Sequence, residues 1–250
     1  TTDRTYLNSI SLIEQLGAEK LEIPIKKSVL QHFEDIGQNP SVHDVTYENA
    51  QARERTQILF DLANQRGGLV IGTGDLSEAA LGWCTFGGDH LSSYNVNASI
   101  TKNVARAMIR QQAQSRDFAS LSSALLDVLD TPVSPELLPP SGTGEIHQKT
   151  EDILGAYELH EFFLYYFVRY RMAPSKILLY ASSAFESIYP LEQIRSTLRV
   201  FLQRFFAGQF KRSCSPDSAA LCDISLSEPF FSIPADGSSQ AMLEELNGTA

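Results

Sequence analysis

The sequence predicts an α/β fold in which helices flank a parallel sheet and the C-terminal half is mostly helical. In the N-terminal half, segments with helical apolar spacing alternate with short segments typical of strands. Residues 69–72 form a continuous apolar run that ends at a glycine, which is typical of a buried parallel strand. From Thr101 onward, helical spacing prevails. We expect residues 1–250 to form a single domain, because a chain of this length can bury a sizeable core.

The N-terminal elements have local signals. Residues 6–16 carry apolar side chains at helical spacing and stop before Gly17, which predicts a helix. Residues 21–25 alternate between polar and apolar side chains like a short strand, whose end or edge position follows from its proline. Two further helices are expected over residues 27–36 and 48–65.

The second half is expected to hold mainly helices. They span residues 157–171, 174–188 and 191–206, and a short helix is expected near Met242. Before them, the Gly- and Asn-rich stretch from residue 82 to 98 is too polar for the core, and the prolines of residues 132–140 indicate a connector or loop.

Composition excludes several classes of protein. The net charge is −10, so the chain is a poor candidate for a general nucleic-acid binder, although a local cationic pocket for a phosphorylated small molecule stays open. The longest apolar stretch, residues 162–168, is too short to span a bilayer. The three cysteines cannot all pair within the chain and lack zinc-site spacing, which favours a reducing, cytoplasmic location.

The segment GTGDLSE, residues 72–78, is the first candidate site. It follows the expected strand and opens a helix, and the carboxyl ends of parallel strands and free N–H groups at helix starts both favour ligands. Thr73 offers a hydroxyl, and Gly74 lets a ligand approach the backbone. The structural alternative is a capping box, because Asp75 is followed three residues later by Glu78.

A lysine in an unusual position is the second candidate. Ser99 or Thr101 has the place of a helix cap, so Lys102 falls in a first turn, where the helix macrodipole disfavours a cation. A phosphate opposite Lys102 would explain this position, and an exposed, solvated lysine is the alternative. On either interpretation, we expect removal of Lys102 to leave the fold unharmed.

Two arginines lie on the helix expected over residues 48–65. Arg55 precedes Ile58 and Leu59 by three and four residues, so it continues the stripe expected to face the core. An arginine there pairs with a carboxylate or reaches a ligand phosphate, and we predict contact with ATP. Arg53 is expected in solvent.

Two further segments carry aromatic or basic residues. In GWCTFGGDH, residues 82–90, Trp83 and Phe86 could stack on a flat ring, while the alternative is a surface loop anchored by tryptophan. Asp89 and its histidine neighbour have no second histidine or cysteine at ligand spacing, so a metal site there is disfavoured. QFKRSC, residues 209–214, is a basic cluster at a helix end, where cations suit the dipole.

Taken together, these segments resemble the synthetase domain of glutamine-dependent NAD synthetases. The run from residue 63 to 98 is highly specific, and the resemblance extends from Thr1 to Asp217. It implies an α/β domain of the ATP-pyrophosphatase type. The stretches that carry it are DVTYENAQARERTQ, LANQRGGLVIGTGDLSEAALGWCTFGGDH, SSYNVNAS, DTPVSPELLP, LGAYELHEFF and QFKRSCSPD.

The resemblance also implies a reaction. ATP, with Mg²⁺, adenylates the nicotinate carboxylate of deamido-NAD and releases pyrophosphate, and ammonia then displaces AMP to give NAD. The ammonia would come from glutamine hydrolysed in a nitrilase-like glutaminase domain upstream in the same polypeptide. The expected partners are therefore deamido-NAD, ATP, ammonia, that upstream domain and further copies in a homo-oligomer, with no nucleic acid and no membrane.

Site residues follow by resemblance. Thr73 and Lys102 resemble ATP-contacting positions, and Glu78 resembles a glutamate that meets deamido-NAD or its Mg²⁺, so Lys102 and Glu78 are the catalytic candidates. The positions that resemble the deamido-NAD site are Asn49, Glu78, Trp83, Cys84, Thr85, Phe86, Asp89 and Lys211.

The sequence also departs from the family pattern. The pyrophosphate loop SGGxDS, with its Mg²⁺-binding aspartate, does not occur in it, so we expect an incomplete ligase domain that is inactive alone. Ala156 and Glu161 stand where proline and aspartate are expected, and the tail after Asp217 lacks the expected loop and arginine. The alternative function is a non-catalytic dinucleotide-binding or assembly module, and the presence of SGGxDS in a longer polypeptide would distinguish the two.

Overall fold

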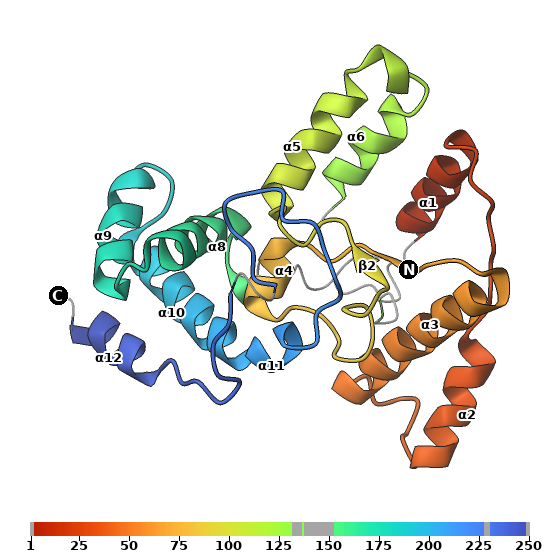
Figure 1. Ribbon diagram of the computed structural model, residues 1–250, viewed down its shortest axis with the longest axis horizontal. Coiled ribbons are helices and arrows are strands. Elements are labelled where there is room, and N and C mark those ends of the chain that lie inside the picture. Colours follow the sequence, from red (N-terminus) through yellow and green to blue (C-terminus); the bar gives the residue numbers. More distant parts are fainter. Residues whose placement is uncertain (1–2, 132–136, 138–152, 228–230, 249–250) are drawn as a thin grey trace.

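The computed structural model describes residues 3–131, 137, 153–227 and 231–248 (Figure 1). The expected connector at residues 132–140 lies, apart from Leu137, outside the described part of the chain.

Three helices open the chain: α1 (Asp3–Gln15), α2 (Lys26–Ile36) and α3 (Val45–Arg66). They confirm the helices expected from the sequence. The strand expected over residues 21–25 is wrong, because those residues form no strand in the structure. Their apolar side chains have no sheet to pack on, as Leu21 is 48% and Ile23 is 45% exposed.

The described residues form a two-stranded sheet from β1 (Ile71–Gly72) and β2 (Tyr94–Asn95), which pair in parallel. The parallel strand expected over residues 69–72 is therefore confirmed for Ile71 and Gly72, whereas residues 69–70 lie outside it. Full burial is wrong, because Leu69 is 73% and Ile71 is 53% exposed while Val70 and Gly72 are buried. β2 lies inside the polar stretch and was not expected, since a half-buried strand of two residues leaves little apolar pattern.

Between and after the strands come α4 (Leu76–Leu81), α5 (Lys102–Ala113), the 3₁₀ turn η1 (Arg116–Phe118) and α6 (Ser122–Asp130). α5 and α6 lie side by side in Figure 1, and the Arg106 guanidinium of α5 donates to the Leu129 carbonyl oxygen at 2.6 Å. Arg4 of α1 pairs with Asp127 of α6, so α1 contacts this helical pair rather than the sheet.

The C-terminal half holds the main core. Its elements are α8 (Tyr157–Leu164), the π-helical turn η2 (Tyr165–Arg169), α9 (Pro174–Ala184), α10 (Leu191–Ala207), α11 (Gln209–Arg212) and α12 (Gln240–Gly248). These confirm the expected helices, although α9 ends before residue 188. The rings of Phe163, Phe201 and Phe205 are fully buried here, and α4 packs against the same cluster.

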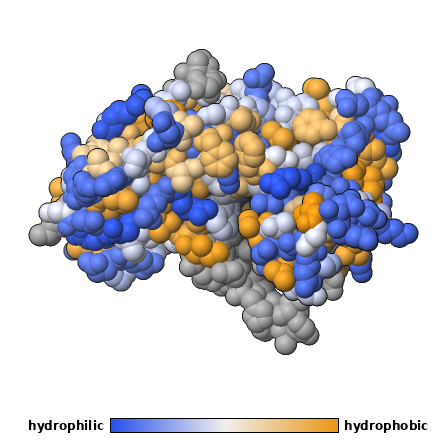
Figure 2. Space-filling view, turned by 90° about the horizontal axis from the view of Figure 1, so that it is seen from below, coloured by the Kyte–Doolittle hydropathy of each residue, from blue (hydrophilic) through white to orange (hydrophobic). Residues whose placement is uncertain are grey.

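In Figure 1, α1, α2 and α3 lie on one side of the sheet and α8, α9, α10 and α12 on the other. Apolar atoms reach the surface in several separate places among hydrophilic ones (Figure 2). The exposed large apolar residues belong to different elements, such as Leu7 of α1 and Leu179 of α9, each 64% exposed. Within the described ranges, no helix is long and apolar enough to cross a membrane.

A buried histidine in α8 predicts acid sensitivity. His160 is 2% exposed, its Nε2 lies 2.8 Å from the Leu154 carbonyl oxygen, and burial lowers its pKa from 6.5 to about 4. The pKa of His160 is lower in the folded chain than in the unfolded chain, so folding favours the neutral imidazole. This stabilisation is fully present above pH 6.5, the unfolded pKa, and is lost as the pH falls from 6.5 to about 4. We expect a loss of about 3 kcal/mol of unfolding free energy over this window.

Urea denaturation across this pH range tests the assignment. The His160→Gln variant keeps an N–H donor for Leu154 but cannot titrate, so its unfolding free energy should fall much less with acid. Equal pH dependence in the variant and the parent chain would assign the acid sensitivity to other groups.

Candidate functional site

The carboxyl ends of β1 and β2 lead into two loops that are tied together. The Asn95 side-chain amide donates to the Gly74 carbonyl oxygen at 2.9 Å, and that of Asn97 donates to the Thr73 carbonyl oxygen at 3.4 Å. The Leu76 N–H donates to the Ile100 carbonyl oxygen at 2.9 Å. The two loops therefore form one edge at the place where parallel sheets bind ligands.

The capping box expected at the start of α4 is confirmed. The Asp75 carboxylate accepts the Glu78 N–H at 2.9 Å, and the Glu78 carboxylate accepts the Asp75 N–H at 3.3 Å. The capping box uses one oxygen of each carboxylate and leaves the other oxygen for another partner.

Those partners converge on Lys102. The Lys102 ammonium lies 2.7 Å from Asp75 Oδ2 and 2.9 Å from Glu78 Oε1, and 5.3 Å from the centre of the Tyr157 ring. Thr101 caps α5, so Lys102 does occupy the first turn. Two carboxylates therefore offset the unfavourable interaction of the Lys102 ammonium with the helix macrodipole. Neither the phosphate interpretation nor the solvent interpretation includes these carboxylates. The expectation that the fold would not suffer without Lys102 is therefore opposed by the geometry.

The charges of this cluster do not cancel, because one cation serves two carboxylates. Burial raises the pKa of Glu78, and the nearby Asp75 raises it further, against the opposing effect of Lys102. Burial lowers the pKa of Lys102, but Glu78 and Asp75 together outweigh it and hold that pKa above its usual value. The lysine stays charged at neutral pH, as a phosphate-binding cation must.

Glu161 of α8 organises the same region and was not predicted. Its carboxylate accepts the Ser77 hydroxyl at 3.0 Å, the Thr101 hydroxyl at 3.0 Å and the Asn103 N–H at 2.9 Å. It thereby joins the starts of α4 and α5 to the core. The sequence signal was weak: a carboxylate within the apolar run of α8 needs partners, but nothing local shows which.

The carboxylates do not provide a ready Mg²⁺ site. Both oxygens of Glu78 and both oxygens of Asp75 already accept the hydrogen bonds and ion pairs described above. In the described part of the chain, no group of three or more histidine, cysteine, aspartate or glutamate side chains could hold a metal ion. The geometry thus disagrees with Glu78 as a Mg²⁺ ligand.

The aromatic loop after α4 has one available ring. The Trp83 ring is half-buried and is covered by the Arg204 guanidinium at 4.8 Å from its centre, so it anchors the loop. Phe86 is 42% exposed, with its ring centre 5.2 Å from that of His90 and 5.3 Å from that of Phe210. Phe86 therefore suits stacking on a planar ligand better than Trp83 does.

Hydrogen bonds fix the position of this loop. The Thr85 hydroxyl donates to Asn49 Oδ1 at 2.9 Å, the Thr85 N–H donates to Asp89 Oδ1 at 2.7 Å, and Arg53 donates to the Phe86 carbonyl oxygen at 3.1 Å. Arg53 is exposed, as expected, and its guanidinium also ties the loop to α3.

The basic cluster lies in the last turn of α11, as expected, and its side chains also reach the C-terminal end of α4 and the loop after it. Lys211 Nζ donates to the carbonyl oxygens of Gly82 and Cys84 at 2.8 and 2.6 Å. Arg212, 3% exposed, donates to the carbonyl oxygens of Ala79 at 3.0 Å and Ala80 at 3.3 Å. These cations therefore satisfy the C-terminal end of α4, far away in sequence.

The remaining predicted residues are placed less centrally. Thr73 is exposed at the loop edge, where a ligand can reach it. Cys84 is half-buried, and burial raises its pKa to about 11, so its thiol stays protonated at neutral pH. Arg55 is exposed, and the expectation that it faces the core is wrong, because α3 buries Ala50, Ala52 and Thr56 instead.

Comparisons with known proteins identify relatives of this chain. The chain is 37% identical to the glutamine-dependent NAD(+) synthetase of Mycobacterium leprae (strain TN), covering 98% of this chain and 40% of that protein. It is 38% identical to that of Mycobacterium tuberculosis (strain ATCC 25618 / H37Rv), covering 99% and 40% respectively. The chain thus spans about two fifths of the length of these relatives.

A solved structure shows the same fold. The glutamine-dependent NAD(+) synthetase from Cytophaga hutchinsonii matches with a TM-score of 0.78 and 21% identity, over 98% of this chain and 39% of that one. This confirms the predicted α/β fold class of the ATP-pyrophosphatase type, with a small sheet and many helices. The NAD synthase family matches residues 1–171, which is more than half of the chain. The chain therefore belongs to the NAD synthase family.

Proposed function

We propose that this chain supplies part of the ligase domain of a glutamine-dependent NAD synthetase. The reaction converts deamido-NAD to NAD. The nicotinate carboxylate attacks the α-phosphorus of ATP and pyrophosphate leaves; ammonia then attacks the adenylated carbonyl carbon, AMP leaves, and a proton is released. Family membership supports this proposal, and the observation that carries it is the charged Lys102 at the carboxyl ends of a parallel strand pair.

Lys102 would stabilise the negative charge of the phosphates of ATP. Asp75 and Glu78 hold its ammonium in place before any ligand arrives, so little reorganisation is needed when charge develops in the transition state. The exposed Thr73 hydroxyl would hold an ATP oxygen at the same edge. In this arrangement Glu78 acts through Lys102 and is a positioning residue.

Phe86 would stack on the nicotinate ring, while Asn49, Thr85 and Asp89 fix the loop that carries it. Lys211, which binds two carbonyl oxygens of that loop, would also position it. The proposal includes a single domain over residues 1–250, a homo-oligomer, a cytoplasmic location and ammonia from glutamine hydrolysis elsewhere in a longer polypeptide.

The first test compares this chain with a longer polypeptide that contains both it and an SGGxDS motif. Given ATP, Mg²⁺, deamido-NAD and ammonium, the longer protein should form NAD, AMP and pyrophosphate in equal amounts. The chain alone should form no NAD, because it lacks the loop expected to hold pyrophosphate. NAD formation by the chain alone at a comparable rate would contradict the proposed role of that loop.

The second test separates the cap from the positioning role. Glu78→Gln keeps a capping residue at this helical position and removes a carboxylate whose ionisation burial already disfavours, so the unfolding free energy should change by less than about 1 kcal/mol. Turnover should fall about tenfold, because Lys102 loses one of its two anchors. If turnover stays unchanged while the fold is intact, Glu78 serves only as a cap.

A further inference from the structure

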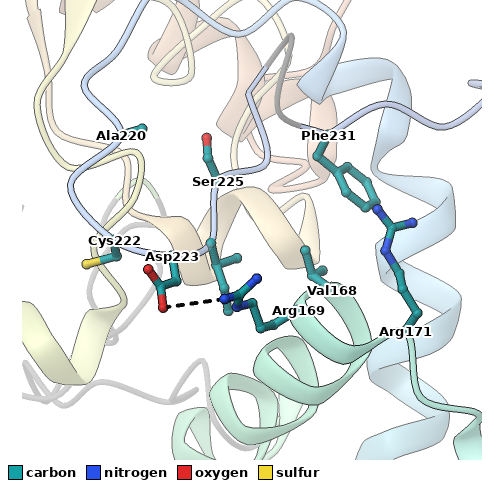
Figure 3. A pocket seen from close by; sticks show the side chains of 9 residues that line it. Val168, Arg169, Arg171, Ala220, Cys222, Asp223, Ser225 and Phe231 are labelled. Atoms are coloured by element: carbon teal, nitrogen blue, oxygen red, sulfur yellow. Dashed lines mark ion pairs between the residues drawn. The ribbon is translucent and has the colours of Figure 1, made fainter.

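A cavity lies away from the candidate site residues. It has a volume of about 300 Å³ and opens between the π-helical turn η2 and the tail segment that diverges from the family pattern (Figure 3). This volume is at the small end of the range for ligand pockets. None of its lining residues belongs to the candidate NAD synthetase site. They are Val168, Arg169, Arg171, Ala220, Cys222, Asp223, Ile224, Ser225 and Phe231.

Two unusual backbone features meet at this cavity. η2 is π-helical over Tyr165–Arg169. Such turns are rare in proteins overall, and those that occur are often found at functional sites. Arg171, just beyond it, has a φ of 53°, and among the described residues it is the one non-glycine with positive φ. A large side chain in this conformation costs free energy that a glycine would avoid. The backbone alone therefore gives no reason for an arginine here, whereas a role for its side chain does.

The Arg171 guanidinium is held without being neutralised. It lies 5.7 Å from the centre of the Phe231 ring, which is 6% exposed, and Figure 3 shows the two side chains together at one end of the cavity. A ring contact orients the guanidinium plane and leaves its N–H groups able to donate. Within the described residues, Arg171 has no ion pair.

The second arginine is only weakly paired. Arg169 Nη2 lies 4.0 Å from Asp223 Oδ2, and these side chains are 52% and 78% exposed, so the pair contributes little. The cavity thus presents two cations against one carboxylate, in a chain whose net charge is −10. The Ser225 side chain lies above Arg169 and Asp223 in Figure 3, with its hydroxyl oxygen pointing away from them and accepting the Ser227 N–H at 3.3 Å.

We propose that this cavity binds a compact phosphate-bearing small molecule, with its oxyanion between Arg169 and Arg171. Arginine suits this role because its N–H groups match the oxygens of phosphate and carboxylate groups in pairs. Val168, Ile224 and Phe231 form an apolar wall that would accept a small apolar part of the ligand. This proposal does not depend on the proposed function, because it uses different residues and a different part of the fold.

The direct test is to measure, by calorimetry, the binding of inorganic phosphate and pyrophosphate to the 250-residue chain. Acetate is measured in parallel as a carboxylate ligand for comparison. Arg171→Gly is the informative variant: it removes the guanidinium, while glycine accepts the positive φ, so thermal stability should be kept. Phosphate binding should weaken by about tenfold or more. The control is Arg110→Ala, on the exposed face of α5, where alanine is used because glycine would destabilise the helix. Phosphate binding by this control should be unchanged.

A second readout uses two exposed cysteines. Cys222 lines the cavity and Cys214 does not, so bound phosphate should slow alkylation of Cys222 by iodoacetamide and leave Cys214 unaffected. Arg171→Gly should abolish this protection. The proposal is overturned if neither phosphate nor pyrophosphate binds, if Arg171→Gly binds them as well as the parent chain does, or if both cysteines are protected equally. Acetate binding as tightly as phosphate would overturn the phosphate assignment and identify a carboxylate site.

Discussion

The Lys102→Ala variant should lose about 2–4 kcal/mol of unfolding free energy at pH 7. Without the ammonium, the Asp75 and Glu78 side chains, which are 8% and 27% exposed, face each other with no cation between them. The pKa of Lys102 is raised in the folded state, so its stabilisation is fully present below the usual value of 10.5 and is lost only as the pH rises through the folded value. Urea denaturation at pH 7 and 5 measures the loss, which should shrink at the lower pH as carboxylates take up protons.

The same variant should lower kcat/KM by about 10²-fold or more, which is the effect of removing one positioned donor from a charged transition state. Lys102→Arg should rescue turnover only in part, because a planar guanidinium does not replace a compact ammonium. Lys27→Ala, on the exposed surface of α2, is the control and should change neither quantity. An unchanged unfolding free energy for Lys102→Ala would show that the two carboxylates do not need their cation.

Arg212→Met should cost about 3 kcal/mol or more of unfolding free energy. The Arg212 guanidinium lies 4.3 Å from the centre of the Phe205 ring, is buried, and satisfies the carbonyl oxygens of Ala79, Ala80 and Phe205. Methionine fills similar space without any donor, so these buried oxygens lose their partner. Burial lowers the pKa of Arg212 to about 10, but the group remains a donor at neutral pH.

The loss should appear in urea denaturation as a lower midpoint with an unchanged slope, because the native fold is weakened but not expanded. The exposed Arg110→Met on α5 is the matched control and should stay within about 0.5 kcal/mol of the parent chain. A loss for Arg212→Met that is no larger than the control's would mean that water replaces the guanidinium at the end of α4.

Local features of this chain could be predicted from its sequence, because the signals lie within a few residues. The capping box of Asp75 and Glu78 and the position of Lys102 in a first helical turn are such features, and the structure confirms both. The ion pair between Glu78 and Lys102 joins residues 24 positions apart, and no local pattern reveals it. The helix dipole correctly marked Lys102 as unusual but could not identify what compensates it.

Contacts between distant segments lie beyond what the local patterns predict. Lys211 and Arg212 lie in the last turn of α11, as expected, but their side chains also donate to the carbonyl oxygens of Gly82 and Ala79, which lie about 130 residues earlier. Arg55 was placed toward the core because Leu59 looked like a core residue, yet Leu59 is 51% exposed. The buried strand expected at residues 69–72 is exposed on one side, since the described sheet has only two strands.

Steady-state kinetics of Lys102→Ala, in the longer polypeptide that forms NAD, tests whether Lys102 stabilises the transition state. The assay follows NAD and AMP formation from ATP, deamido-NAD and ammonium, below the temperature at which the variant begins to unfold. We expect equal amounts of both products from the parent enzyme and a drop of about 10²-fold or more in kcat/KM for the folded variant. A folded Lys102→Ala enzyme with near-normal kcat/KM would contradict it, and would show that Lys102 only balances the charges of Asp75 and Glu78.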